Sequence, residues 1–277
     1  MTTYWQRLAD RTNQRGTLCV GIDPHPGLLK AWGLDVNAAG LETFARRVVE
    51  VLGERVAVFK PQSAFFEAHG SAGVAVLERV LTDIAGAGAL SLLDVKRGDI
   101  GSTMDAYAAA YLADGAPLAA DAITVSPYLG FGSLAGTIEL AESSDRGVYV
   151  LALTSNPEGR QVQHALAASG RLVAEEIVDA AAAANAGKAY GNVGLVVGAT
   201  IGRTGVDLSQ VHGSLLSPGI GAQGAGARDL AEVFGEALRY VLPAASRELL
   251  SAGPDPIAIR TKAEQLLTQM KTTLPVG

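Results

Sequence analysis

The chain has 277 residues, of which 48% are hydrophobic and 18% charged, a composition typical of a globular protein. Its net charge of −6 offers no broad basic surface, which disfavours nucleic-acid binding. One cysteine, Cys19, and four scattered histidines favour neither a disulfide framework nor a metal site. The polar N-terminus and the absence of a long apolar segment predict a cytoplasmic protein.

Short apolar runs, punctuated by glycine and proline, recur along the chain and predict eight β-strands. Most runs are continuous rather than alternating in hydrophobicity, as expected for strands covered on both sides. The predicted strands span residues 18–23, 56–61, 90–96, 122–127, 147–153, 193–199, 214–220 and 242–249.

Helical periods separate these strands. Apolar residues at 41, 44, 45, 48, 49 and 52 form one stripe, and similar spacing returns at 77–84 and 230–238. Further helices are predicted to end at Gly187 and to span 257–270. Alternating strands and helices imply a parallel sheet, and eight units favour a single-domain (β/α)8 TIM barrel over residues 1–277. The long polar segment 202–213 is either a mobile lid or an inert surface loop.

Polar residues stand at the ends of the first four predicted strands. These residues are Asp23, Lys60, Asp94, Lys96, Thr124 and Ser126. In a closed barrel such strand ends converge on one mouth, where active sites are built. A single polar residue at a strand end is usually a cap or a turn former, but four successive ends indicate a site.

Asp94 and Lys96 are two residues apart on a predicted strand, so both side chains point to one face. An inward face would bury both charges, which requires a charge network, a bound substrate or both; a purely structural ion pair is the alternative. Lys60 and Asp23 could extend this pair into alternating positive and negative charges. Such alternation is typical of a site tuned for proton transfer.

The run Asp94-Val95-Lys96-Arg97-Gly98-Asp99-Ile100 resembles the DxKxxDI signature of orotidine 5′-phosphate decarboxylases, and Thr103 follows at the family's spacing. Four more stretches are similar to motifs of that family, and 59–67 resembles its larger bacterial subgroup. These stretches are Gly21-Ile22-Asp23-Pro24, Phe59-Lys60-Pro61-Gln62, Thr124-Val125-Ser126-Pro127-Tyr128 and Ser217-Pro218-Gly219-Ile220-Gly221-Ala222-Gln223-Gly224.

The resemblance implies decarboxylation of orotidine 5′-monophosphate to UMP, the last step of de novo UMP biosynthesis, without a metal or an organic cofactor. It implies that Lys96 protonates C6 of the pyrimidine as carbon dioxide leaves. Asp94 would lie against the substrate carboxylate and disfavour the bound ground state. Lys60 and Asp99 would complete the charge chain. Because the family's last aspartate enters the neighbouring subunit's site, the resemblance also implies an obligate homodimer.

The same resemblance assigns substrate contacts around the mouth. Asp23 would hold a ribose hydroxyl and Ser126 would contact the pyrimidine. The glycine-rich loop 218–224 and Arg247 on the next predicted strand would hold the phosphate. This chain reads Ala245-Ser246-Arg247 where the family usually has Gly-Arg. The predicted substrate-binding residues are Asp23, Ile100, Thr103, Ser126, Pro218, Gln223 and Arg247.

Three other functions fit parts of the pattern. A Mg²⁺-dependent sugar-phosphate decarboxylase or epimerase of the same barrel group shares the Asp-x-Lys-x-x-Asp run, but it would need a further carboxylate cluster at the mouth. A Schiff-base aldolase would use Lys60 or Lys96 as nucleophile, whereas the flanking carboxylates keep both amines charged. A barrel that merely binds a nucleotide would leave the paired charges without a task.

Overall fold

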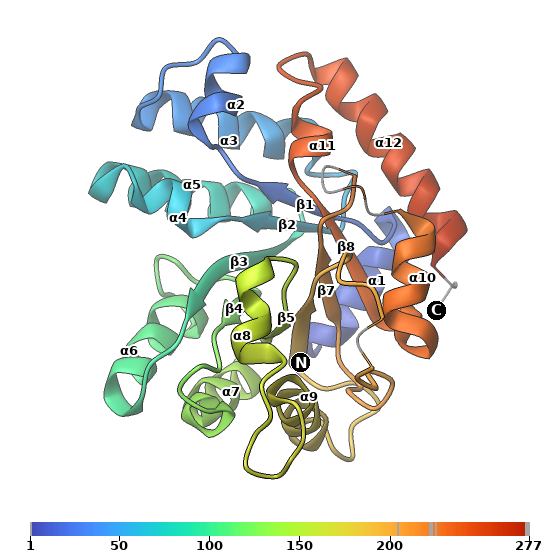
Figure 1. Cartoon of the computed structure of the whole chain (residues 1–277). Helices are drawn as coiled ribbons and strands as arrows, with labels where there is room; N and C mark the ends of the chain where they lie inside the picture. Colours follow the sequence, from blue (N-terminus) through green and yellow to red (C-terminus); the bar gives the residue numbers. More distant parts are fainter. Residues whose placement is uncertain (1, 204, 222–223, 225, 275–277) are drawn as a thin grey trace.

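Eight short parallel strands form the centre of the molecule. They are β1 (Cys19–Ile22), β2 (Val58–Pro61), β3 (Leu90–Arg97), β4 (Ala122–Val125), β5 (Gly147–Leu153), β6 (Val193–Val197), β7 (Leu215–Pro218) and β8 (Val241–Ala245). Each strand pairs with the next along the chain and β8 pairs with β1, which closes the barrel (Figure 1). The predicted barrel is therefore confirmed. The computed structural model describes residues 2–203, 205–221, 224 and 226–274.

Helices surround the strands and cover the outside of the barrel. Those described are α1 (Tyr4–Arg15), α2 (Pro26–Ala31), α3 (Ala38–Leu52), α4 (Ser63–Glu67), α5 (Gly70–Gly86), α6 (Gly101–Leu112), α7 (Ala135–Ser143), α8 (Arg160–Gln163), α9 (Val173–Ala184), α10 (Ala227–Phe234), α11 (Arg247–Leu250) and α12 (Pro256–Thr273). Within the described ranges, no helix is both long enough and apolar enough to cross a membrane.

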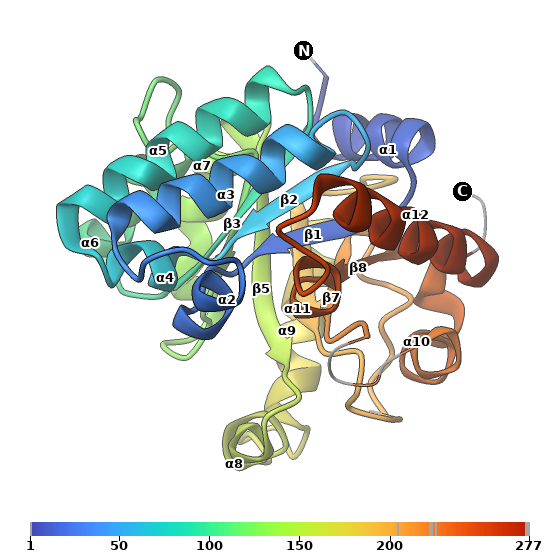
Figure 2. The ribbon, with the colours of Figure 1, turned by 90° about the horizontal axis from the view of Figure 1, so that it is seen from above.

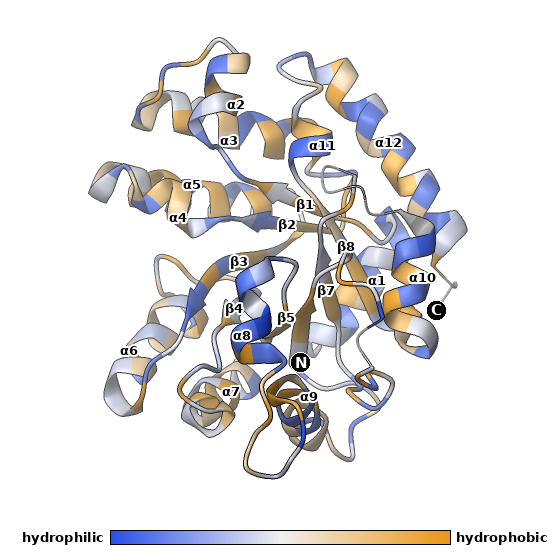
Figure 3. Cartoon of the chain, in the orientation of Figure 1, coloured by the Kyte–Doolittle hydropathy of each residue, from blue (hydrophilic) through white to orange (hydrophobic). Residues whose placement is uncertain are grey.

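The helices are amphipathic, and α3 shows why. The Asn37 side chain caps its first turn by accepting a hydrogen bond from the Gly40 N–H at 2.9 Å. Leu41 and Phe44, on the predicted stripe, are fully buried, whereas Arg46 on the opposite face is exposed. Figure 3 shows this pattern as alternating apolar and polar bands along α3, and it shows β3 turning polar towards its end.

Helix α1 closes the end of the barrel at which the strands begin. Figure 2 places α1 at this end and α8 beyond the opposite one. The Tyr4 ring enters the barrel interior, where its hydroxyl lies 2.9 Å from that of Tyr149. Gly147 is required here, because a Cβ at this position would lie 2.5 Å from the Tyr4 ring. With this end plugged, the opposite mouth is left for the polar strand ends.

Most predicted strand ends lie within two residues of the observed ones, but three boundaries differ by more: α12 ends at Thr273 rather than at 270, and the other two concern β8 and α9. Strand β8 ends at Ala245, and the residues predicted to form its second half instead form α11, which begins at Arg247. The apolar pair Leu249–Leu250 is buried from a helix rather than from a strand, in a segment of helix-favouring residues. Helix α9 stops at Ala184 rather than at Gly187. The next residue, Asn185, is buried, and its side-chain amide donates to the Val193 and Val211 carbonyls at 2.7 and 2.8 Å.

Candidate active site

The Asp94 carboxylate lies at the centre of a compact group of hydrogen-bond donors. Its Oδ2 accepts from Lys60 Nζ at 2.8 Å and from Gln62 Nε2 at 2.9 Å. Its Oδ1 accepts from Lys96 Nζ at 2.5 Å and from Thr124 Oγ1 at 2.7 Å. The side chains of Asp94 and Lys60 are only 7% and 8% exposed. Two ammonium groups and two neutral donors thus satisfy one buried carboxylate.

Three adjacent strands deliver these groups. Lys60 is on β2, Asp94 and Lys96 are on β3, and Thr124 is on β4, all towards the ends that share the barrel mouth. Gln62 follows β2 directly and forms an isolated parallel bridge with Asp94. The arrangement therefore depends on the register between strands far apart in the sequence, because β2 and β3 are separated by α4 and α5.

Lys96 departs from a regular strand. The pairing of β3 with β4 shifts register between Leu93 and Arg97, and Lys96 has φ of 45°, in the left-handed region. Its N–H donates to Thr124 Oγ1 at 3.0 Å, which helps to hold this conformation. The expectation that both charges of the Asp94–Lys96 pair are buried is wrong for Lys96, whose side chain is 44% exposed. A strained backbone at a polar cluster is typical of functional sites.

Electrostatics keep this network charged. Burial alone would raise the pKa of Asp94, but the ammonium charges of Lys60 and Lys96 outweigh it and hold the pKa well below its usual value. Burial alone would lower the pKa of Lys60, yet the carboxylates of Asp94 and Asp23 raise it above its usual value. Lys60 therefore remains an ammonium ion, which argues against a free amine nucleophile at this position.

A cavity of about 110 Å³ adjoins the charged group. It is lined by Gly21, Asp23 and Lys60 together with residues 218–220 and 244–247. The structure thus brings Asp23, Pro218 and Arg247 to one place, beside Lys60. Arg247 reaches the cavity from the start of a helix rather than from a strand.

The other predicted site residues lie outside the Asp94 group, and Gln223 lies outside the described residues. In the part of the chain that the structure describes, the Asp99 carboxylate accepts only from the Ile100 N–H, at 2.8 Å. Ile100 is 62% exposed and Thr103 is exposed on the first turn of α6. Ser126 follows β4, and its N–H donates to the Arg97 carbonyl at 2.7 Å.

Sequence reasoning assigned no role to Gln62 or to Arg97. Gln62 stands two residues after Lys60, a spacing that could have placed both side chains on one side of an extended segment. The Arg97 guanidinium donates to Glu67 at 2.5 Å and to the Tyr111 hydroxyl at 3.2 Å. It ties α4 and α6 to the end of β3, beside the segment that carries Asp99.

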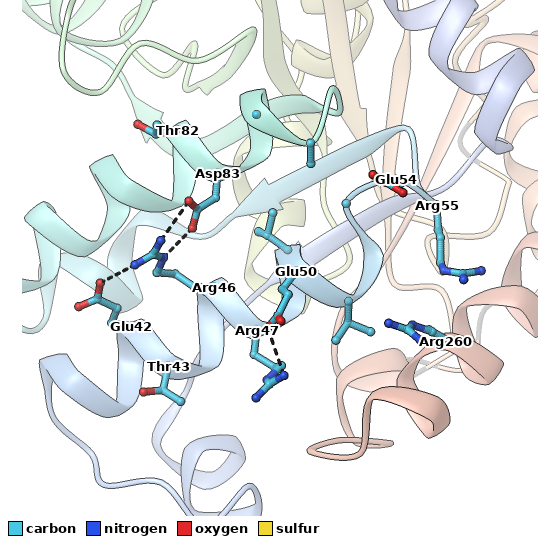
Figure 4. Close-up of a pocket in the computed structure, with 15 residues that line it drawn as sticks. Glu42, Thr43, Arg46, Arg47, Glu50, Glu54, Arg55, Thr82, Asp83 and Arg260 are labelled. Atoms are coloured by element: carbon cyan, nitrogen blue, oxygen red, sulfur yellow. Dashed lines mark hydrogen bonds and ion pairs between the residues drawn. The ribbon is translucent and has the colours of Figure 1, made fainter.

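A larger hollow, of about 1000 Å³, lies on the outside of the barrel between α3, α5 and α12. Figure 4 shows that several of its charged groups pair with one another: Arg46 with Asp83 and Glu42, and Arg47 with Glu50. These ion pairs are exposed and contribute little, and among the described residues of this hollow only Arg260 has a buried polar side-chain atom, Nε, without a hydrogen-bond partner. The mouth is therefore the better candidate for an active site.

A parallel barrel with a lysine–aspartate–lysine group at the carboxyl ends of its strands defines a class of enzymes that act at the barrel mouth. The family described as "Orotidine 5'-phosphate decarboxylase / HUMPS family" matches residues 16–261, and the chain belongs to this family.

Curated relatives and solved structures agree with this assignment. The chain is 58% identical over 275 residues to the orotidine 5′-phosphate decarboxylase of Salinispora tropica, covering 99% of both proteins. It is 54% identical over 279 residues to that of Streptomyces coelicolor, again covering 99% of both. A crystal structure from Streptomyces avermitilis matches with a TM-score of 0.95 at 55% identity, covering 99% of this chain and 96% of that one. The OMP decarboxylase of Leishmania donovani matches with a TM-score of 0.78 at 32% identity, covering 98% of both chains.

Proposed function

We propose that this protein decarboxylates orotidine 5′-monophosphate to UMP and carbon dioxide, the last step of UMP biosynthesis. The observation that carries the proposal is the buried Asp94 carboxylate between two ammonium groups at the barrel mouth. Relatives that are 58% and 54% identical over nearly the whole chain are named for this activity. The magnesium-dependent sugar-phosphate alternative is therefore not favoured.

The chemistry follows from the charges of Asp94 and Lys96. A substrate carboxylate placed against Asp94 is repelled by a group whose lowered pKa keeps it ionised. As carbon dioxide leaves, that second negative charge moves from the carboxylate onto C6, away from Asp94 and towards the Lys96 ammonium, so the transition state is stabilised relative to the bound ground state. The electron pair of the broken C–C bond stays on C6, and a proton from Lys96 Nζ forms the new C–H bond. Lys96 then regains a proton from solvent, to which it is exposed.

The remaining predicted residues bind the substrate in this proposal. Asp23 holds a ribose hydroxyl, Ser126 contacts the pyrimidine, and Pro218, Gln223 and Arg247 hold the phosphate. This arrangement is supported by a single cavity beside Lys60, which is lined by Asp23, Pro218 and Arg247. Binding energy from the phosphate, remote from C6, then helps to assemble the reactive geometry. These steps use only protein groups, so neither a metal nor an organic cofactor takes part.

Incubating the pure protein with orotidine 5′-monophosphate in excess EDTA tests the activity. We expect the pyrimidine absorbance to fall as UMP forms, at the same rate with and without the chelator. Failure of well-folded protein to consume this substrate would remove the proposal. Activity on a β-keto sugar-phosphate acid that requires added Mg²⁺ would support the alternative instead.

We also propose a homodimer whose subunits share their sites. The neighbouring segments after β3 and β4 expose three large apolar side chains: Ile100 is 62% exposed, Tyr128 76% and Leu129 50%. A second copy covering this surface would bring Asp99, which lies in the first of these segments, to the partner's site.

A cytoplasmic location likewise stays a prediction.

Mixing two inactive variants tests the shared site. Lys96→Ala and Asp99→Ala proteins should regain activity after subunit exchange, because a mixed dimer then carries both lesions in one site and leaves the other intact. If each residue served its own chain's site, every mixed dimer would hold two defective sites. A tagged chain and a size measurement show whether mixed dimers have formed. If they have formed and the mixture is still inactive, the shared site is refuted.

A further inference from the structure

The cavity beside Lys60 is too small for a whole nucleotide. Its volume is about 110 Å³, whereas pockets that enclose drug-sized ligands are roughly 300–1000 Å³. It therefore suits one end of the proposed substrate. Its walls come from the ends of β1, β2, β7 and β8, and Asp23, Ser246 and Arg247 supply polar side chains to it besides Lys60.

The Ser246 hydroxyl in this wall is buried but unsatisfied. Its Oγ has no hydrogen-bond partner among the described residues, although most buried polar atoms in proteins have one. Ser246 precedes α11, yet its side chain makes no capping hydrogen bond to that helix. Burying this hydroxyl costs desolvation free energy that no hydrogen bond from the described residues offsets.

Gly21 fixes where this hydroxyl lies. A Cβ built on Gly21 would stand 2.7 Å from the Ser246 Cβ and 3.1 Å from its Oγ. The absence of a side chain on β1 is therefore what admits Ser246 at this position. The same point is 3.4 Å from Oδ2 of Asp23, so the hydroxyl and the carboxylate face one region of the cavity.

Asp23 and Ser246 suit different parts of a ligand. Oδ1 of Asp23 is also buried without a partner among the described residues. An ionised carboxylate only accepts hydrogen bonds and repels a phosphoryl oxygen, whereas a serine hydroxyl can donate to one. Arg247, next in sequence and in the same wall, offers a guanidinium suited to phosphate. The sugar hydroxyl therefore belongs with Asp23 and the phosphoryl group with Ser246 and Arg247.

We propose that the Ser246 hydroxyl donates a hydrogen bond to the 5′-phosphoryl group of the nucleotide. The inference rests on the proposed function, and it assigns a role in phosphate recognition to Ser246, the residue directly before Arg247. The hydroxyl adds one donor that recognises phosphorylated ligands and contributes nothing to the base or the ribose.

Calorimetric titration of wild type and Ser246→Ala with three ligands tests this role. UMP and ribose 5-phosphate carry the phosphoryl group, whereas uridine lacks it. Loss of a hydrogen bond to a charged group weakens binding about ten- to one-hundred-fold. We expect Ser246→Ala to raise Kd by such a factor for UMP and ribose 5-phosphate alike, and to leave uridine binding, measured up to its solubility, within about twofold.

Two further variants complete the experiment. Ser246→Gly removes the same hydroxyl and should reproduce the result, while Ser214→Ala removes a buried hydroxyl just before β7, at the other end of the barrel, and should leave all three ligands unaffected. Thermal unfolding verifies that each variant is folded. Unchanged UMP and ribose 5-phosphate binding, or an equal loss for uridine, would overturn the role of Ser246. Failure of wild type to bind UMP would instead overturn the proposed function.

Discussion

Replacing Lys60 with methionine tests whether the charges at the barrel mouth stabilise one another. Methionine is also unbranched, so the substitution removes the ammonium but keeps much of the buried volume. Asp94, only 7% exposed, loses the donor at 2.8 Å and keeps Lys96 at 2.5 Å. Removing one partner of a buried ion pair costs about 3–5 kcal/mol. Because Lys96 still neutralises Asp94, we expect the lower end, about 3 kcal/mol.

Urea unfolding at pH 7 measures this loss. Lys188→Met is the matched control, because it breaks an exposed pair with Glu142 whose side chains are 36% and 54% exposed. That change should cost about 0–1 kcal/mol. The double variant Lys60→Met/Asp94→Asn should recover part of the loss, since it no longer buries a carboxylate stripped of its partner. A loss of less than about 1 kcal/mol for Lys60→Met would refute the reasoning.

Three further predictions concern the same residues. The lowered pKa of Asp94 stabilises the fold above about pH 4, where the unfolded carboxyl is ionised, and this contribution is lost as pH falls through the folded-state pKa. In urea titrations, the stability difference between wild type and Asp94→Asn should stay level from about pH 5 to 8 and shrink below about pH 4; a difference that grows on acidification contradicts the assignment. Gln62→Ala removes a donor to Asp94 at 2.9 Å and should lower kcat/KM about tenfold, and a change under about twofold would show that the amide is dispensable. Arg247→Ala should lower kcat/KM for orotidine 5′-monophosphate about one-hundredfold while leaving the slow reaction of orotidine unaltered; equal losses would place Arg247 away from the phosphate.

Local sequence patterns predict much of the fold. The run 147–153 predicts β5 with the bounds that the structure gives it, because this apolar segment is too short for a typical helix and contains two β-branched valines and a tyrosine. The same reasoning misplaces 242–249. There the apolar pair after Ser246 packs from a helix, and hydrophobicity alone does not distinguish the two ways of burying it.

The candidate site is harder to predict from local sequence patterns than the fold. Its charged residues follow from strand ends, but the four donors on Asp94 come from three strands and the residue after one of them. Only the closed barrel brings Gln62 and Thr124 to that carboxylate, and Lys96, which is 44% exposed, lies where β3 shifts register. The predicted role of Asp99 needs a second chain, which no single sequence pattern can position.

Release of labelled carbon dioxide from orotidine 5′-monophosphate, labelled at its carboxylate, tests the central claim most directly. Wild type should release one equivalent of label for each UMP formed, and so should the surface control Lys188→Met. Lys96→Ala should release none while still binding UMP, because it lacks the proton donor but keeps the phosphate cavity. Release at the wild-type rate by Lys96→Ala, or no release by wild type that binds UMP, would contradict the account.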